Sequence, residues 1–102
     1  MADMATLLDT LEDKADALEG LGYKVRMDLT DGGRIFIDGT ADPVEIREGD
    51  DEADTVLKLS SDNLMKLVEG RLSPMIAFST GRLKVEGSQG VALKLAALFE
   101  SD

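Results

Sequence analysis

The chain has 102 residues, a net charge of −10, and neither cysteine nor histidine. This length suits a single domain with one modest core, and the lack of cysteine excludes disulfides and thiolate metal sites. The acidic balance argues against a nucleic-acid partner, because phosphate binding needs a basic surface. No run of about 18 apolar residues occurs and the first residues are not basic, so we expect neither a membrane span nor a secretory signal.

The acidic charge is concentrated in the first part of the chain. Residues 1–59 hold 16 acidic and 6 basic side chains, whereas residues 60–102 hold 5 of each. The acidic part favours solubility and disfavours strong attraction to anionic lipid surfaces. The neutral part is therefore the less repulsive surface for a lipid or a partner protein.

An amphipathic helix is predicted over residues 3–19. Apolar side chains recur there at spacings of four and three, and acidic side chains fill the other faces. Gly20 and Gly22 are suitable residues to end the helix. The apolar stripe consists of Met4, Leu8, Leu11, Ala15 and Leu18.

Four strands are predicted to follow. Residues 23–30 alternate apolar and polar side chains, which is typical of a half-buried strand. Asp31-Gly32-Gly33 is a hairpin signal, because glycine accepts the positive φ that such turns need. Further strands are expected over residues 34–38, 44–47 and 55–59.

The acidic loop from Glu48 to Asp54 offers several oxygen ligands that calcium could use. Its residues do not follow the alternating ligand pattern of an EF-hand. A solvated loop that blocks pairing at a sheet edge explains the same residues without a metal. We therefore expect no metal site.

Helical periodicity returns after residue 59. A helix is predicted over 60–70, where Ser60 or Ser61 can act as the N-cap. Another is predicted from Ser73-Pro74 to about residue 81, because proline suits a first turn. A fifth strand over 82–86 and a last helix from Ser88 to about residue 100 complete the chain. The order predicts an α+β fold, with a five-stranded, largely antiparallel sheet and helices over one face.

Recognisable catalytic chemistry is absent from the sequence. The chain lacks histidine, which is the commonest general base, and it lacks cysteine, which thiol catalysis requires. No serine or lysine lies in a familiar nucleophile motif, and Gly87-Ser88-Gln89-Gly90 lacks the spacing of a phosphate-binding loop. Carboxylates leave a carboxylate enzyme open, but the residues favour a binding protein without a cofactor.

The last helix carries apolar side chains nearly all round, with Lys94 as the only charge between Gly90 and Glu100. A helix packed on a sheet needs one apolar stripe, so the second face needs cover. Another helix of the chain, a partner subunit or a ligand could provide it. The short helices between residues 64 and 78 pose the same question, because their leucine and methionine side chains suit a filled core and a hollow one equally well.

Residues 54–98 resemble the second half of the sterol carrier protein 2 domain. The resemblance rests on the order and spacing of several stretches, and the first part of the chain matches in its pattern of a helix followed by strands joined by a glycine hairpin. We therefore expect residues 1–102 to form a single lipid-binding domain of this type. The matching stretches are 54–59, 64–74, 77–78, 81–87 and 90–95.

The resemblance implies a hydrophobic tunnel that holds fatty acid, acyl-CoA, phospholipid or sterol, and no catalysis by the domain itself. It also implies that the helices matching 62–69 and 74–79 and the last helix border the tunnel. A tryptophan at Leu95 is then expected to block lipid uptake and leave the fold nearly intact. The expected lipid-binding residues are Leu64, Met65, Val68, Met75, Ile76, Phe78, Leu83, Val91, Leu95 and Leu98.

Three features depart from the family pattern. Ser79 stands where many members have a second aromatic residue, and Gln89 stands where many have an apolar residue near the tunnel. Both weaken the case for sterol in particular. The chain ends at Ser101-Asp102 without a Ser-Lys-Leu-type address, so we expect a cytoplasmic protein rather than a peroxisomal one.

Two functions are left open by the sequence. The first is a lipid carrier, monomeric or homodimeric, that makes transient contact with membranes. In this function Arg71, Arg82 and Lys84 either meet a lipid head group or are ordinary solvated charges. The alternative is an interaction or dimerisation module, whose apolar last helix binds a second copy or another protein and carries no lipid.

Overall fold

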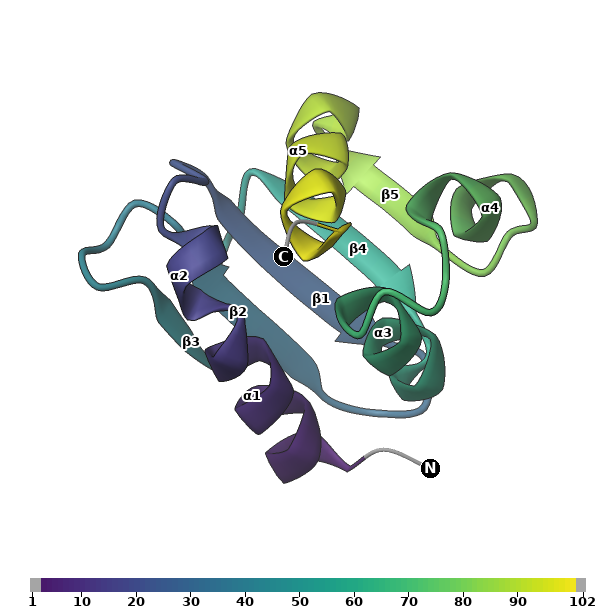
Figure 1. The fold of residues 1–102 in the computed structure, drawn as a ribbon, viewed down its shortest axis with the longest axis horizontal. Coiled ribbons are helices and arrows are strands. Elements are labelled where there is room, and N and C mark those ends of the chain that lie inside the picture. The colour runs from purple at the N-terminus through teal and green to yellow at the C-terminus, as the bar shows by residue number, and fades with distance from the viewer. Residues whose placement is uncertain (1–2, 101–102) are drawn as a thin grey trace.

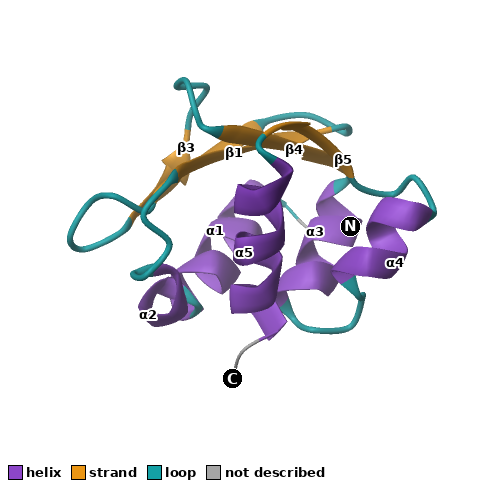
Figure 2. Cartoon of the chain, turned by 90° about the horizontal axis from the view of Figure 1, so that it is seen from above, coloured by secondary structure: helices purple, strands orange, loops and turns teal. Residues whose placement is uncertain are grey.

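Residues 3–100 are described by the computed structural model, in which the helices lie on one face of a five-stranded sheet (Figures 1 and 2). The observed order of elements confirms the predicted α+β fold. The elements are α1 (Met4–Asp13), α2 (Ala15–Leu18), β1 (Lys24–Leu29), β2 (Arg34–Asp38), β3 (Glu45–Glu48), β4 (Thr55–Leu59), α3 (Ser61–Val68), α4 (Pro74–Ser79), β5 (Lys84–Gly87) and α5 (Gln89–Glu100).

The strands are arranged in the order β3-β2-β1-β4-β5, so β3 and β5 form opposite edges of the sheet. Three of the neighbouring pairs are antiparallel, and one of them is the β1–β2 hairpin that the glycine turn predicts. The central pair of β1 and β4 is parallel, with Met27 opposite Leu57. The sheet is therefore mixed but mostly antiparallel.

Alternation along the strands separates a helix-covered face from an open face. Val25, Met27 and Leu29 of β1 are buried, whereas Arg26 and Asp28 between them are only half-buried. This is the pattern that the sequence predicts for a strand with one covered face.

Phe36 is the exception on the open face of the sheet. Only 4% of its surface is exposed, although its neighbours Ile35 and Ile37 point into the core on the other face. The strand register places Phe36 between Arg26 and Arg47. The Arg47 guanidinium lies 5.0 Å from the centre of the Phe36 ring, so charged side chains cover this aromatic residue.

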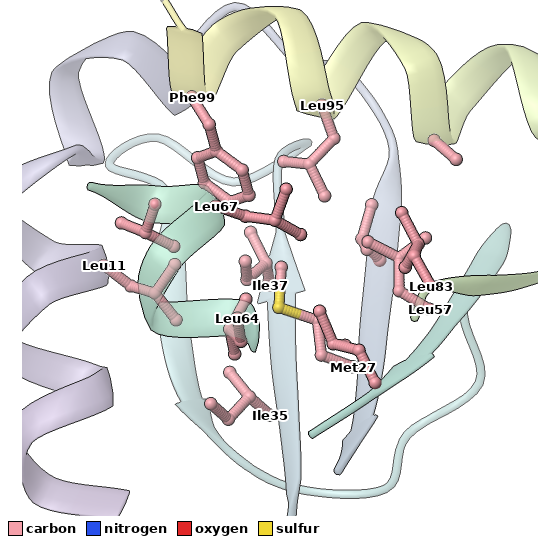
Figure 3. Close-up of a cluster of buried hydrophobic side chains, with 14 of the residues drawn as sticks. Leu11, Met27, Ile35, Ile37, Leu57, Leu64, Leu67, Leu83, Leu95 and Phe99 are labelled. Carbon is pink, nitrogen blue, oxygen red and sulfur yellow. The ribbon is translucent and has the colours of Figure 1, made fainter. Parts of the chain in front are cut away.

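One hydrophobic core fills the space between the sheet and the helices. Figure 3 shows α5 directing Leu95 and Phe99 toward side chains of α3 and the sheet. Leu95 has no exposed surface, and Phe99 has 3%. The labelled core residues also include Leu11, Met27, Ile35, Ile37, Leu57, Leu64, Leu67 and Leu83.

The single helix predicted over residues 3–19 is wrong, because the chain forms α1 and α2 with a break at Lys14. The Lys14 N–H donates to the Leu11 carbonyl oxygen at 2.9 Å, which is the shorter bond of a 3₁₀ turn. Leu11 and Leu18 are buried as expected. Leu7 is also buried, while Leu8 from the predicted stripe is only half-buried.

The predicted helix caps before α3 and α5 are confirmed. Ser60 Oγ accepts a hydrogen bond from the Asn63 N–H at 3.1 Å, and Ser88 Oγ accepts one from the Val91 N–H at 3.2 Å. These side chains fix where both helices begin. No helix within residues 3–100 combines the length and apolar character needed to cross a membrane.

Candidate functional site

An apolar pocket lies between α4, β5 and α5, at one edge of the sheet. Its volume is about 170 Å³, and eight of its nine lining residues are apolar. The lining residues are Pro74, Met75 and Phe78 from α4, Leu83 and Val85 from β5 and the turn before it, and Gln89, Ala92, Leu93 and Ala96 from α5.

Helix α5 builds its side of the pocket from one stripe of side chains. Gln89, Ala92, Leu93 and Ala96 are spaced i, i+3, i+4 and i+7, so they share one face of the helix. The two alanines project little beyond the backbone and leave space between α5 and α4. A different stripe on α5, containing Val91, Leu95 and Phe99, packs into the core.

The apolar character of α5 on nearly all sides therefore serves two surfaces. The chain's own elements cover the core-facing stripe, since α5 contacts α2, α3, β4 and β5. The other stripe faces the pocket, where Leu93 is 58% exposed. The second face of the helix is thus left for the pocket rather than covered by another helix.

Helix α4 forms the outer wall and is attached through few side chains. Pro74 and Ala77 are its buried residues, whereas Met75 and Phe78 are 67% and 49% exposed. The Ala77 carbonyl oxygen also accepts hydrogen bonds from the N–H groups of Arg82 and Leu83. Two of the three α4 side chains that line the pocket, Met75 and Phe78, are therefore partly open to solvent.

The floor of the pocket is continuous with the core. Leu83 and Val85 lie on the same face of β5, and Leu83 is 6% exposed and belongs to the core cluster (Figure 3). Val85 is opposite Leu57 in the sheet and is half-buried. A ligand in the pocket would therefore rest on core side chains.

The structure brings three of the ten expected lipid-binding residues to this pocket, namely Met75, Phe78 and Leu83. Ile76 is 54% exposed and is not among the lining residues. The other six pack in the core or at its margin. They are Leu64, Val68, Val91 and Leu95 in the core, and Met65 and Leu98 against it.

The expected effect of a tryptophan at Leu95 needs correction. Leu95 is fully buried beside Leu67 and Phe99, so a larger side chain there has no space to enter (Figure 3). Overpacking of a core costs about 1–3 kcal/mol, and often more for so large a change. This substitution would therefore damage the fold together with any lipid uptake.

Five lining residues were missed by sequence reasoning, and the spacing on α5 is the signal that could have identified three of them. A stripe of small and polar side chains beside a fully apolar one indicates a second surface. Gln89 is the single polar side chain in the pocket, at the first residue of α5. The resemblance had already placed Gln89 near the tunnel, and the missed residues are Pro74, Val85, Ala92, Leu93 and Ala96.

A second depression, of about 360 Å³, lies on the other side of β5. Lys58, Arg82 and Lys84 contribute its charges, and Thr30, Ser60 and Asn63 contribute polar groups. Because Leu83 faces the apolar pocket, its neighbours Arg82 and Lys84 face the opposite side of the strand. Lys58 also pairs with Glu86 at 3.0 Å.

The β3 edge holds a larger depression of about 520 Å³, but its walls are charged. Asp28 and Asp50 lie there with Arg34, which approaches them at 3.6 and 3.9 Å. Its open and ionic lining does not suit an apolar ligand.

The acidic loop before β4 is held by specific contacts. Asp51 accepts a hydrogen bond from Arg47 at 2.6 Å, and Asp54 accepts one from the Lys24 N–H at 2.8 Å. The bond from Arg47 lowers the pKa of Asp51, and the bonds to Asp51 and Glu45 raise the pKa of Arg47. Among the described residues, no group of three or more acidic, histidine or cysteine side chains is placed to hold a metal ion.

Asp31 links the hairpin between β1 and β2 to the start of α3. It accepts hydrogen bonds from the side-chain hydroxyl of Ser61 and, at 2.9 Å, from the Ser61 N–H. These two bonds, the hydroxyl first, lower the pKa of Asp31. The carboxylates with shifted pKa values thus lie outside the apolar pocket.

Comparison with known proteins identifies the family. The model of the SCP-2 sterol transfer family matches residues 4–100. The chain belongs to this family. The resemblance noted in the sequence is therefore confirmed, and it covers the elements that form both the core and the apolar pocket.

Curated relatives and solved structures match this chain at modest identity. The chain is 34% identical over 93 residues to hydroxysteroid dehydrogenase-like protein 2 of Bos taurus. The matched segment covers 89% of this chain and 22% of that protein. It thus spans about a fifth of the length of this curated relative. The structure of sterol carrier protein 2 from Yarrowia lipolytica in its apo form has 26% identity and a TM-score of 0.71, over 92% of this chain and 84% of that one.

The structure of a sterol carrier protein 2 from Aedes aegypti, in complex with the C16 fatty acid palmitate, has a TM-score of 0.77. Its sequence identity is 17%, over 97% of this chain and 96% of that one. At this identity the likeness concerns the fold. The same arrangement of sheet and helices therefore occurs in a protein that holds a fatty acid.

Proposed function

We propose that this chain is a non-catalytic lipid carrier that holds the apolar part of its ligand between α4, β5 and α5. The observation that carries the proposal is the apolar pocket at the β5 edge, in which Gln89 is the only polar lining residue. Membership of the SCP-2 sterol transfer family and the palmitate complex of the Aedes aegypti neighbour support it.

Burial of an acyl chain supplies the driving force. Each methylene that leaves water contributes about 0.8 kcal/mol, so a long chain has enough to offset the ordering costs of binding. Fatty acid, acyl-CoA, phospholipid and sterol share such an apolar part. Gln89 is the residue placed to hydrogen bond a polar group of the ligand.

The pocket must widen to hold a whole lipid. Its volume of about 170 Å³ is smaller than the roughly 300–1,000 Å³ of usual ligand pockets, and an apolar cavity of about 150 Å³ holds benzene. Helix α4 is the wall that can move, because Pro74 and Ala77 alone among its residues are buried. Displacement of α4 away from α5 would lengthen the pocket and, of the core side chains, would move only Ala77.

The proposed carrier has no catalytic role of its own. None of the nine lining residues is ionisable, so the pocket offers neither an acid nor a base to a bound lipid. The dehydrogenase-like relatives are several times longer than the matched segment. Any activity of such a whole protein would then belong to other parts, with this segment presenting or storing lipid.

Two neighbouring alanines on α5 provide the sharpest test. Ala96 lines the pocket, whereas the adjacent Ala97 is exposed and does not. Titration with a fluorescent fatty acid should show saturable binding to the wild type, displaced by unlabelled fatty acid. Ala96→Trp should weaken that binding at least about tenfold by filling the pocket, and Ala97→Trp should leave it within about twofold.

Native mass spectrometry of the freshly purified protein would complement the titration by showing any lipid that copurifies. Saturable binding that both tryptophan variants retain would place the lipid elsewhere on the chain. A second candidate, an interaction module, is favoured by the exposed Met75, Ile76, Phe78 and Leu93. A protein that binds no lipid and sediments as a stable dimer would support that function and refute the carrier.

A further inference from the structure

The two edges of the sheet carry very different charge. Residues 38–54, which include β3 and its flanking loops, hold eight carboxylates and one cation. Residues 70–85, which include α4 and the start of β5, hold Arg71, Arg82 and Lys84 and no carboxylate. Figures 1 and 2 both place α4 and β5 at the end of the molecule opposite β3, α1 and α2. The acidic and basic regions are therefore separated along the sheet.

The basic end also carries exposed apolar side chains. Met75, Ile76 and Phe78 on α4 and Leu93 on α5 are between 49% and 67% exposed. Tyr23 is the other large hydrophobic residue exposed among residues 3–100. Met75, Phe78 and Leu93 line the apolar pocket, so a surface that covers them would also cover the pocket.

Cations lie across β5 from these exposed apolar side chains. Arg82 and Lys84 flank Leu83 along the chain and line the basic depression on the other side of β5 with Lys58. Neither Arg82 nor Lys84 forms a salt bridge with a carboxylate of the described residues. Exposed apolar side chains with unpaired cations across the edge strand match the layered chemistry of a bilayer surface, with anionic head groups above acyl chains.

We propose that the β5 edge docks on anionic lipid bilayers, and that lipid enters and leaves the pocket in the docked state. The inference rests on the proposed lipid carriage. Met75, Ile76, Phe78 and Leu93 would enter the head-group region, while Arg82 and Lys84 meet lipid phosphates. A second copy of the chain is a poorer occupant of this surface, because a face-to-face dimer would bring the same cations of both copies together.

The net charge of −10 does not prevent this docking at physiological salt. The molecule is 33 Å long, whereas the Debye length is about 8 Å at 0.15 M ionic strength. The acidic β3 end is then screened from a membrane that touches the β5 end. At larger separations the uneven charge turns the molecule so that the β5 end approaches the membrane first.

The test is cosedimentation with vesicles of phosphatidylcholine alone and vesicles that also contain phosphatidylglycerol. Wild type should bind the anionic vesicles more tightly. Arg82→Glu with Lys84→Glu should weaken that binding about tenfold, because two contacts with an anionic surface become repulsive. Lys14→Glu with Lys24→Glu makes the same change in net charge at the acidic end and should alter binding less than about twofold.

Ile76→Ser tests the apolar part of the surface. Ile76 is 54% exposed on α4 but does not line the pocket. The variant should bind anionic vesicles several-fold more weakly and keep the wild-type affinity for a fluorescent fatty acid in vesicle-free solution. Equal loss of vesicle binding in both double variants would show that net charge alone governs association, and would overturn the assignment of the β5 edge.

Ligand transfer separates this inference from the proposed function. With docking, the rate at which a fluorescent fatty acid moves from the protein to acceptor vesicles rises with vesicle concentration and with phosphatidylglycerol content. A rate independent of both, from a protein that binds the fatty acid normally, would refute docking and leave lipid carriage standing. Absence of fatty-acid binding in solution would refute the carrier itself, and the inference with it.

Discussion

The two edges of the sheet differ in how far their side chains are paired and covered by the rest of the chain. At the β3 edge, Arg47 pairs with Glu45 and Asp51 and covers the ring of Phe36. At the β5 edge, α4 lies beside the strand but leaves Met75 and Phe78 half open to solvent. One edge pairs its arginine with carboxylates and covers its aromatic residue within the chain. The other keeps both apolar and cationic groups available, which is typical of a surface that binds something else.

The difference indicates where stability and function reside. Substitutions at the β3 edge should affect folding and spare lipid binding, and those at the pocket rim should do the reverse. The four predictions below test this division.

The largest effect on folding is expected for Phe36→Ala. The ring is 4% exposed, and loss of a buried phenylalanine side chain lowers the free energy of unfolding by about 2 kcal/mol. Urea denaturation measures this change, and fatty-acid affinity should stay at the wild-type value. A change below about 0.5 kcal/mol would show that the arginine cover gives Phe36 no real burial.

Phe78→Ser should produce the opposite result at the pocket rim. Phe78 is 49% exposed, so its loss should change the free energy of unfolding by less than about 0.5 kcal/mol. Loss of its contact with an acyl chain should raise the dissociation constant of a fluorescent fatty acid about threefold to tenfold. Tyr23→Ser is a matched control, since Tyr23 is 42% exposed and lies outside the apolar pocket. Equal loss in both variants would argue against a specific rim contact.

Asp31→Asn should lower stability at neutral pH but not in acid. The bonds from Ser61 hold the pKa of Asp31 below its ordinary value of 3.8 in the folded chain. The charged form therefore stabilises the fold above about pH 4, and this contribution is lost as the pH falls through the folded-state pKa. Urea denaturation of wild type and variant should differ at pH 7, and the difference should disappear once the pH falls below the folded-state pKa of Asp31. A difference that persists in acid would mean that the charge of Asp31 is not its cause.

The smallest expected effect is a salt optimum in vesicle binding. At about 0.01 M ionic strength the Debye length is about 30 Å, which approaches the 33 Å length of the molecule. The membrane then also repels the acidic β3 end. Cosedimentation with anionic vesicles should therefore weaken modestly at this low salt, and weaken again above physiological salt as the contacts of Arg82 and Lys84 are screened. A steady increase in binding toward low salt would contradict the charge separation.

The fold was largely predictable from the sequence because its signals are local. Alternation from Val25 to Leu29, the glycines of the hairpin and the serine caps of α3 and α5 each act within a few residues. The break at Lys14 was not predicted, since no proline or glycine marks it. The parallel pairing of β1 with β4 was also beyond local signals, because it joins segments far apart in the chain.

The candidate site was less predictable. The expected residues were apolar, and composition does not distinguish a side chain that fills a core from one that lines a pocket. Leu64 and Leu95 proved to be core residues, whereas Ala96 and Gln89 line the pocket. Pockets form where small side chains leave space. Small residues on one helix face are therefore a better indicator of a pocket than large apolar residues are. The cytoplasmic location and the oligomeric state stay predictions.

The division of α5 into two stripes has a consequence for how such proteins diversify. Residues that hold the fold and residues that set the width and polarity of the pocket alternate along one helix, yet point in different directions. Descendants of a common ancestor can therefore exchange alanine, glutamine or bulkier side chains at positions 89, 93 and 96 with little penalty to folding, whereas Ala92 also belongs to the core and is constrained by it. Ligand preference can drift among relatives while the scaffold stays recognisable.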